Sequence, residues 1–254
     1  MTEPSNLSSS EGARSTSTLK EQWGKLLALA SLVAIALGSF NDSMDALEKI
    51  YDFSLSQFTD IPSQNKLDSV YVRASAAVLD EQLGAPIYLK HSSHGETIKY
   101  YQDGRFILSA VVKEDAIAAY LVFPLDGFIP DTSKSAKGSL LLQHPFNTDE
   151  EITDFRVSYS RAVTYYLEES AEGAFSNLYS SVSGYSEFDV EPTQTQREAL
   201  AALANAMVLG DDMVPLAETL RAQLKPNFYG YSMLGLQALE EAILTRSEYQ
   251  LIRP

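Results

Sequence analysis

Two histidines close together are the first residues whose type and spacing could do chemistry. His91 and His94 stand three apart, a spacing that suggests metal ligands. They fall at a predicted strand end and in the turn after it, and no carboxylate cluster completes a ligand set beside them. We therefore interpret them as surface histidines and predict no metal site.

A serine between two glycines is the second candidate. Residues 230–235 (GYSMLG) resemble the nucleophile elbow of α/β-hydrolases, but the second glycine comes one residue late. His144 precedes Ser232, whereas hydrolases of that fold place their histidine after the serine. We predict a loop before a helix here.

Three pairs of adjacent carboxylates could serve general acid–base catalysis. They are Glu168 with Glu169, Asp211 with Asp212, and Glu240 with Glu241. Neighbouring side chains on a strand point to opposite faces, so the first pair cannot converge on one bond. The second pair follows a helix-ending glycine and begins the next helix, where negative charge is favourable. We predict no catalytic residue.

Composition removes other kinds of site. Cysteine is absent, which excludes thiolate nucleophiles, disulfides and cysteine-ligated zinc. No P-loop or dinucleotide-binding glycine pattern occurs. Residues 1–40 are neutral, so the rest of the chain carries the whole net charge of −15, which repels nucleic-acid phosphates. We predict no cofactor and no nucleic-acid partner.

The fourteen tyrosines are the remaining chemical signal. Aromatic side chains on strands could line a groove for a peptide or glycan, although they are also ordinary strand formers that pack across strands. The candidates for an interaction surface are Tyr165, Tyr166, Tyr229 and Tyr231.

An apolar segment near the N-terminus is the first of the structural elements that the sequence predicts. Residues 26–40 (LLALASLVAIALGSF) carry no charge, and Trp23 and Lys25 precede them as interfacial residues do. A helix over residues 23–40 would extend roughly 27 Å, at the short end for a bilayer core of about 30 Å. We predict a transmembrane helix here; a cleaved signal peptide and a buried helix of a soluble fold are the alternatives.

The flanking bases predict how the chain is oriented. Arg14, Lys20 and Lys25 precede the segment, and only Lys49 stands among the twenty residues after it. The positive-inside rule then places the N-terminus in the cytoplasm and the rest of the chain outside. We predict a single-pass protein of the bacterial inner membrane, with an acidic domain in the periplasm.

The chain divides into three parts on this basis. They are a disordered Ser/Thr-rich tail at 1–22, the transmembrane helix and its extension at 23–60, and a soluble α+β domain at 61–254. Residues 54–65 look like a linker or a helix end, because Pro62 biases Ile61 away from helix.

Periodicity predicts the elements of the α+β domain. Apolar residues at helical spacing indicate one helix from Leu67 to Leu83, ended by Gly84 and Pro86, which packs on an antiparallel meander. Strands are expected at 87–91, 97–101, 106–112, 116–123, 152–167 and 175–188. Helices are expected at 192–209, with Thr193 as N-cap and Gly210 as its end, at 214–224 and at 234–244.

Five short motifs carry a family resemblance. They are WGKL at 23–26, LGAP at 83–86, VTYYL at 163–167, KPNFYG at 225–230 and YQLIR at 249–253. Together they resemble a family of uncharacterised bacterial single-pass membrane proteins, which implies an envelope location and no known activity. Residues 67–123 are also similar to SmpA-type lipoproteins and β-lactamase inhibitory proteins, a likeness that implies protein binding.

The function predicted from the sequence is a membrane-tethered, non-enzymatic binding or scaffold protein of the cell envelope. It would contact the membrane through residues 23–40 and a protein partner through an apolar patch near Tyr165 and Tyr229. The alternative is a membrane-bound hydrolase using dispersed carboxylates, which requires two acids in one cleft.

Overall fold

The structure is a computed structural model that describes residues 60–132, 142–148, 152–170 and 178–253. These residues belong to one compact unit, Asp60–Pro254. The predicted tail at 1–22 and the predicted membrane segment at 23–40, with Trp23 and Lys25, lie outside the described residues. Among the residues described, no helix combines the length and the apolar character that crossing a membrane requires.

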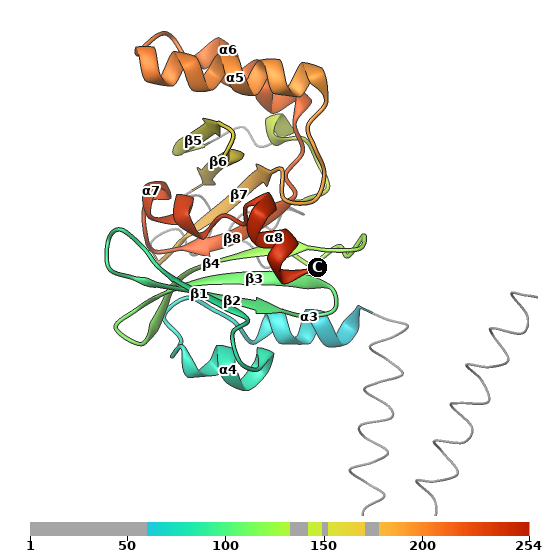
Figure 1. Ribbon diagram of the computed structural model, residues 1–254, viewed down its shortest axis with the longest axis vertical. Coiled ribbons are helices and arrows are strands. Elements are labelled where there is room, and N and C mark those ends of the chain that lie inside the picture. The colour runs from blue at the N-terminus through green and yellow to red at the C-terminus, as the bar shows by residue number, and fades with distance from the viewer. Residues whose placement is uncertain (1–59, 133–141, 149–151, 171–177, 254) are drawn as a thin grey trace, which may run out of the picture. The chain divides into compact units, whose positions relative to one another are not determined.

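An antiparallel sheet, eight-stranded in the described ranges, has the strand order β1-β2-β3-β4-β8-β7-β6-β5 (Figure 1). Its first half is the predicted meander, made of β1 (Tyr88–His91), β2 (Thr97–Gln102), β3 (Phe106–Lys113) and β4 (Ala116–Pro124). The Asp103 amide donates to the Phe106 carbonyl at 2.9 Å and closes the β2–β3 turn. Each bound lies within one residue of its prediction, so the meander and the α+β class are confirmed.

The second half of the sheet differs from the prediction. It contains β5 (Asp154–Tyr159), β6 (Thr164–Ser170), β7 (Ser180–Ser186) and β8 (Phe228–Ser232). The single strand predicted at 152–167 is two strands, because the Ser160 amide donates to the Val163 carbonyl and closes a turn between them. The loop predicted at 230–235 is also wrong at its start, since β8 runs to Ser232 between β4 and β7.

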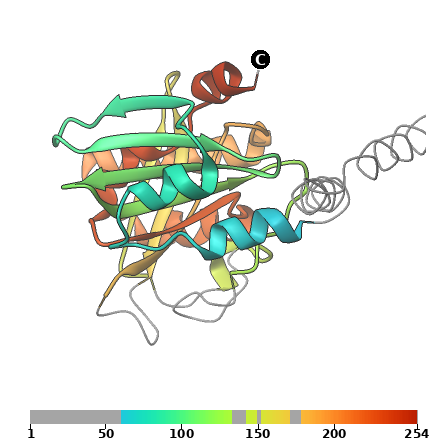
Figure 2. The ribbon, with the colours of Figure 1, turned by 90° about the horizontal axis from the view of Figure 1, so that it is seen from below.

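Two short helices stand where one was predicted. They are α3 (Ile61–Asp68) and α4 (Ala77–Leu83), and Figure 2 shows both against the meander. Residues 73–76 bond to β4 instead of continuing a helix, with the Arg73 amide 2.8 Å from the Ile117 carbonyl. Pro62 occupies the first turn of α3, where a missing amide proton costs nothing, so the linker prediction was wrong over residues 61–65.

Two further helices cover the second half of the same sheet face. They are α5 (Gln194–Leu209) and α6 (Val214–Gln223). Tyr185 on β7 packs against both helices. Tyr185 and Ser183 are two residues apart on the strand, so their side chains point to the same face of the sheet. Ser183 pairs with Tyr229 on β8, so Tyr229 lies on this face as well. The predicted caps of α5 are confirmed, since Thr193 completes a capping box and Gly210 adopts a left-handed conformation.

The opposite face is covered by the C-terminal elements. These are α7 (Leu236–Leu239), the 3₁₀ helix η2 (Glu240–Ala242) and α8 (Arg246–Ile252). They pack on a core that includes Tyr100, Leu121 and Phe228. The single helix predicted at 234–244 was therefore too long. A short 3₁₀ helix, η1 (Phe146–Thr148), lies beside α6.

Candidate functional site

The four tyrosines proposed as an interaction surface fall into two groups. Tyr165 and Tyr166 are neighbours on β6, so they point to opposite faces, and they expose only 5% and 0% of their surface. Tyr229 and Tyr231 stand two apart on β8, so they share a face. Tyr165 and Tyr229, near which an apolar patch was expected, are both buried in core clusters.

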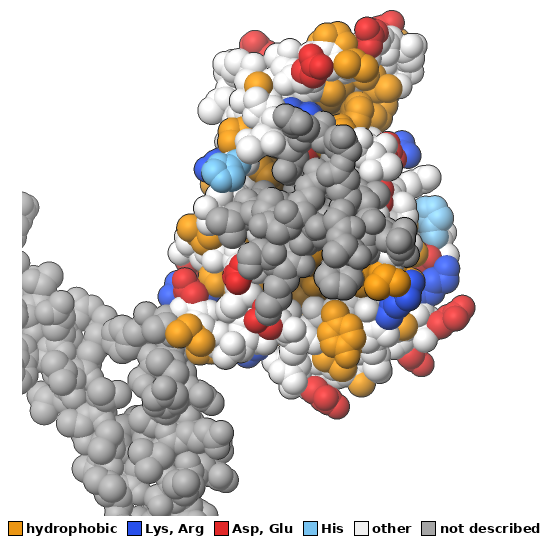
Figure 3. Space-filling view, turned by 180° about the vertical axis from the view of Figure 1, so that it is seen from behind, with side chains coloured by type: hydrophobic (Ala, Val, Ile, Leu, Met, Phe, Trp, Pro, Cys, Tyr) orange, Lys and Arg blue, Asp and Glu red, His pale blue; other side chains and the backbone are white. Residues whose placement is uncertain are grey.

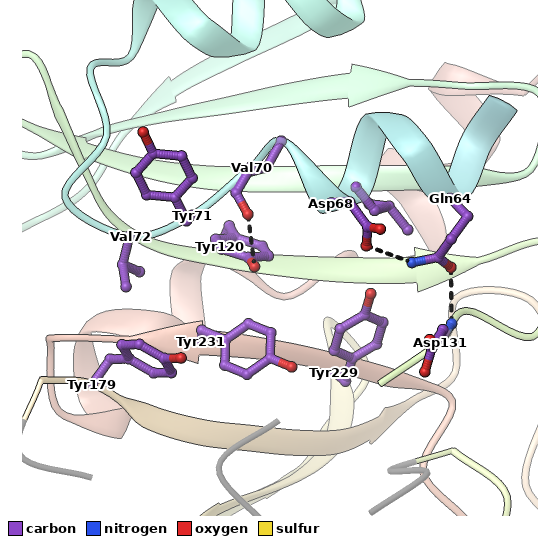
Figure 4. Close-up of a pocket in the computed structure, with 11 residues that line it drawn as sticks. Gln64, Asp68, Val70, Tyr71, Val72, Tyr120, Asp131, Tyr179, Tyr229 and Tyr231 are labelled. Carbon is purple, nitrogen blue, oxygen red and sulfur yellow. Dashed lines mark hydrogen bonds between the residues drawn. The ribbon is translucent and has the colours of Figure 1, made fainter. Parts of the chain in front are cut away.

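A cavity of about 240 Å³ lies beside Tyr229 and Tyr231 (Figure 4). Its two sides are α3 with the segment that follows it, and the strands β4 and β8. Five tyrosines line it, namely Tyr71, Tyr120, Tyr179, Tyr229 and Tyr231. They come from four separate segments of the chain, so the fold alone brings them together.

Ring packing holds these tyrosines in place. The Tyr231 ring centre lies 5.6 Å from that of Tyr120, 5.5 Å from that of Tyr179 and 6.1 Å from that of Tyr229. The last two pairs are edge-to-face, the arrangement that ring quadrupoles favour. The Tyr120 hydroxyl donates to the Val70 carbonyl at 3.1 Å and ties β4 to the segment after α3. The wall of the cavity is therefore preformed.

Two carboxylates also line the cavity. The Gln64 amide donates to Asp68 Oδ1 at 2.9 Å, and its oxygen accepts from the Asp131 backbone amide at 2.8 Å (Figure 4). Burial, followed by Tyr231, Asp68 and Asp131, raises the pKa of Tyr229 above its usual range. Burial, Tyr179 and Asp131 raise the pKa of Tyr231 in the same way. The hydroxyls of Tyr229 and Tyr231 are therefore neutral in physiological conditions.

A more open hollow adjoins the cavity and shares Tyr179 with it. Its volume is about 350 Å³, and Arg73, Glu169 and Met233 contribute to its lining. Arg73 has a positive φ of 73°, which is uncommon for a residue with a side chain. Its Nε lies 3.4 Å from the Met233 sulfur, so the strained backbone places a base at the edge of the tyrosine cluster.

The residues that suggested catalysis do not assemble. The Ser232 hydroxyl donates to the Leu234 carbonyl at 2.7 Å and accepts from the Leu234 amide at 2.8 Å, which commits it to a turn. Glu241 accepts the backbone amide of Ser93, and Glu168 pairs with Arg221. Within the described ranges, no three His, Asp or Glu side chains form a group that could hold a metal.

A second exposed feature lies at the turn between α5 and α6. Figure 3 shows apolar side chains gathered at the end of the molecule that these helices form. Val208, Leu209 and Val214 expose most of their surface there. Asp211 and Asp212 are also exposed in this turn, where the sequence predicted the start of a helix, and α6 begins two residues later.

Three cavity tyrosines and both carboxylates were missed by sequence reasoning. Tyr71, Asp68 and Asp131 fall in segments predicted as helix or loop, and Tyr120 was predicted only as part of a strand. The signal that could have joined them was the pairing of β4 with β8, which depends on recognising β8. Comparison of the chain with protein families, with curated proteins and with solved structures finds no match.

Proposed function

We propose that this protein is a membrane-tethered, non-enzymatic binding or scaffold protein of the bacterial cell envelope, and that its partner docks at the tyrosine-lined cavity. The tether is residues 23–40, supported by the uncharged run between Lys25 and Asn41 and by the interfacial position of Trp23. The bases before this run support an external location for the folded domain.

The observation that carries the binding role is the preformed aromatic wall of the cavity. Tyrosines offer a large contact area and lose little conformational freedom on binding, and ring packing has already fixed Tyr231 and its neighbours. Tyr71, at 60% exposure, extends this wall toward solvent. Tyrosine is also enriched among the residues that dominate binding energy in protein interfaces.

The hydrolase alternative has less support. Asp68 and Asp131 are two carboxylates in one cavity, which is the geometric minimum that it requires. The described lining places them among tyrosines, one glutamine and apolar side chains, and it contributes no histidine or serine that could act as a nucleophile or proton carrier.

Site-specific photocrosslinking in living bacteria tests the docking site. A benzophenone side chain at position 71 should give a discrete adduct on illumination, and Tyr231→Ala in the same chain should remove it. The control position is Val208, which is 85% exposed at the C-terminal end of α5. No adduct from position 71, or an adduct that Tyr231→Ala leaves undiminished, overturns the proposed site.

Membrane fractionation tests the tether. After alkaline extraction, the full chain should remain in the membrane pellet, and protease added to spheroplasts should digest the folded domain. Recovery of the full chain in the soluble fraction, or protection of the domain from protease, overturns the tether or its orientation.

A further inference from the structure

We propose that a second copy of this chain pairs with the β1 edge of the sheet, so that the sheets of the two copies continue through a β1–β1 contact. The proposal goes beyond the docking site described above, because β1 contributes no residue to the described lining of the tyrosine cavity. It is carried by the open backbone groups of β1, by the apolar side chains beside them and by a register in which the strand complements itself.

The backbone of β1 is open on one side. β1 is the first strand of the described sheet order and pairs with β2 alone among the described strands (Figure 1). The Ser92 amide, one residue past β1, donates to the Glu96 carbonyl at 2.8 Å, on the side of β2. Backbone groups alternate in direction along a strand, so Leu89 and His91 point their amides and carbonyls away from β2. Such a row of groups is a template for another strand.

Apolar side chains surround this open edge. Ile87, Tyr88 and Leu89 expose 47%, 38% and 54% of their surface, and Leu251 at the end of α8 exposes 76%. A hollow of about 140 Å³ lies between α8 and β1, lined in part by Ile87, Tyr88 and Leu251. Scattered apolar residues are ordinary on a surface, but an end strand that combines them with unpaired backbone is a site of association unless something protects it.

The lysine of β1 does not give that protection. A charged side chain on an end strand normally discourages pairing. The Lys90 side chain instead turns onto one face of the sheet, where its Nζ lies 2.7 Å from Glu248 Oε1 and 5.2 Å from the centre of the Tyr100 ring. Its charge is compensated there, so a second strand can approach β1 without leaving this lysine as an unpaired charge.

The strand complements itself when a two-fold axis passes through Leu89. Leu89 then lies opposite its own copy, and the outward amide and carbonyl of each bond to those of the other. Tyr88 lies opposite Lys90 of the second copy, on the face that carries Glu248. Apolar side chains therefore meet on one face, and an aromatic ring meets the stem of a lysine on the other. An axis through Lys90 would set two lysines opposite each other, which is unfavourable.

The first test is the mass of the full-length protein in detergent micelles, measured by light scattering with the detergent mass subtracted. The wild type should be a dimer. Leu89→Pro removes an amide that faces outward, a position at which an end strand tolerates proline, so this variant should be a monomer with an unchanged circular dichroism spectrum. A monomeric wild type, or a folded Leu89→Pro variant that remains a dimer, overturns the proposal.

Cysteine crosslinking tests the contact without depending on the proline variant, because the chain has no cysteine of its own. Oxidation of Leu89→Cys should give disulfide-linked dimers, since Cα atoms of a hydrogen-bonded pair lie about 5.5 Å apart, within the disulfide range of about 4.4–6.8 Å. The matched control is Tyr159→Cys, at an exposed position of β5, the opposite end strand, and it should remain monomeric on reducing-free gels. Equal crosslinking of the two variants, or none at position 89, overturns the contact.

A mixed-chain experiment tests the register. Tyr88→Cys and Lys90→Cys chains, mixed before oxidation, should form more crosslinked dimer than either chain alone, because the register sets these two positions opposite each other. Equal yields from the mixture and from the single chains overturn the register on which the proposal rests.

Discussion

Arg221 and Glu168 form a buried ion pair between α6 and β6, and breaking it should be one of the most damaging changes in this fold. Arg221 Nε lies 3.0 Å from Glu168 Oε2, and the two side chains expose only 11% and 3%. Arg221 Nη2 also donates to the Phe146 carbonyl at 2.8 Å, and the Tyr166 hydroxyl donates to the same carboxylate oxygen at 3.0 Å. The pair therefore joins α6, β6 and η1.

Arg221→Met keeps much of the apolar volume but leaves the Glu168 carboxylate without the guanidinium. Removing one partner of a buried pair costs about 3–5 kcal/mol. Losing the hydrogen bond to Phe146 costs about 1 kcal/mol more. We expect the free energy of unfolding to fall by about 4–6 kcal/mol near neutral pH, which is a large part of the roughly 5–15 kcal/mol that native proteins have. The deficit should shrink as the pH falls, because protonation removes the negative charge of the buried Glu168 carboxyl.

Urea unfolding of the full-length protein, followed by circular dichroism, measures this loss. The double variant Glu168→Gln with Arg221→Met has no buried charge at the site, so it should recover to within about 2 kcal/mol of the wild type. The control is Arg197→Met, which breaks an exposed pair with Glu191 and should lower the unfolding free energy far less than Arg221→Met does. A loss below about 1 kcal/mol for Arg221→Met, or no recovery in the double variant, refutes this reasoning.

Three further changes test the fold. Gly230→Ala would place a methyl group 2.1 Å from the Tyr120 carbonyl oxygen in the middle of the sheet, so the free energy of unfolding should fall by at least about 3 kcal/mol in the same urea assay. The control is Gly104→Ala, whose methyl group enters open space and should change the free energy of unfolding by less than about 1 kcal/mol. Thr193→Ala removes the α5 capping box and should lower the urea midpoint, at a cost of about 1 kcal/mol; an unchanged midpoint contradicts the cap. The Ser92 hydroxyl, 2.5 Å from Glu96, lowers the pKa of that carboxyl, so the stability difference between wild type and Ser92→Ala should be largest above the usual glutamate pKa of about 4.3 and shrink as the pH falls through the lowered value. The part that remains at low pH comes from the backbone amides of His94 and Glu96, which donate to the same hydroxyl. Midpoints measured across this range that differ by a constant amount contradict the last prediction.

Local sequence signals were sufficient for the first half of the sheet. Asp103 and Gly104 mark a turn between two apolar runs, and each strand pairs with its sequence neighbour, so the meander needs no long-range information. The caps of α5 were equally local, because Thr193 and Gln196 are three residues apart. Local chemistry therefore predicted both correctly.

The same signals failed where tertiary contacts decide the structure. β8 contains Gly230 and follows Pro226, two residues that argue against a strand, yet it is buried between β4 and β7. Gly230 is required there, because any side chain would collide with the neighbouring strand. The helix predicted from Leu67 failed for a related reason, since residues 73–76 bond to β4.

The period of two along a strand explains which of the candidate tyrosines lie together. The rule that separates Glu168 from Glu169 applies equally to Tyr165 and Tyr166, which could not have shared a surface. Tyr229 and Tyr231 satisfy the rule, and they are the pair that lines the cavity. The remaining lining could not be predicted from local sequence signals. Its residues lie on α3, on β4 and just before β7, and only the tertiary fold brings these segments to β8.

The position of the cavity follows from that sheet order. On one face, α3 and α4 pack over the meander and α5 and α6 pack over β5 to β7, while β4 and β8 lie at the centre of the strand order. Every described lining residue belongs to α3, to the sheet or to their adjoining segments, and none comes from α5 or α6. The cavity lies over the central strands, between the two pairs of helices on this face. Polar groups are tolerated there that a closed core would not tolerate. The tyrosine hydroxyls and the two aspartates therefore occupy the part of this face where polar groups least disturb the packing on either side.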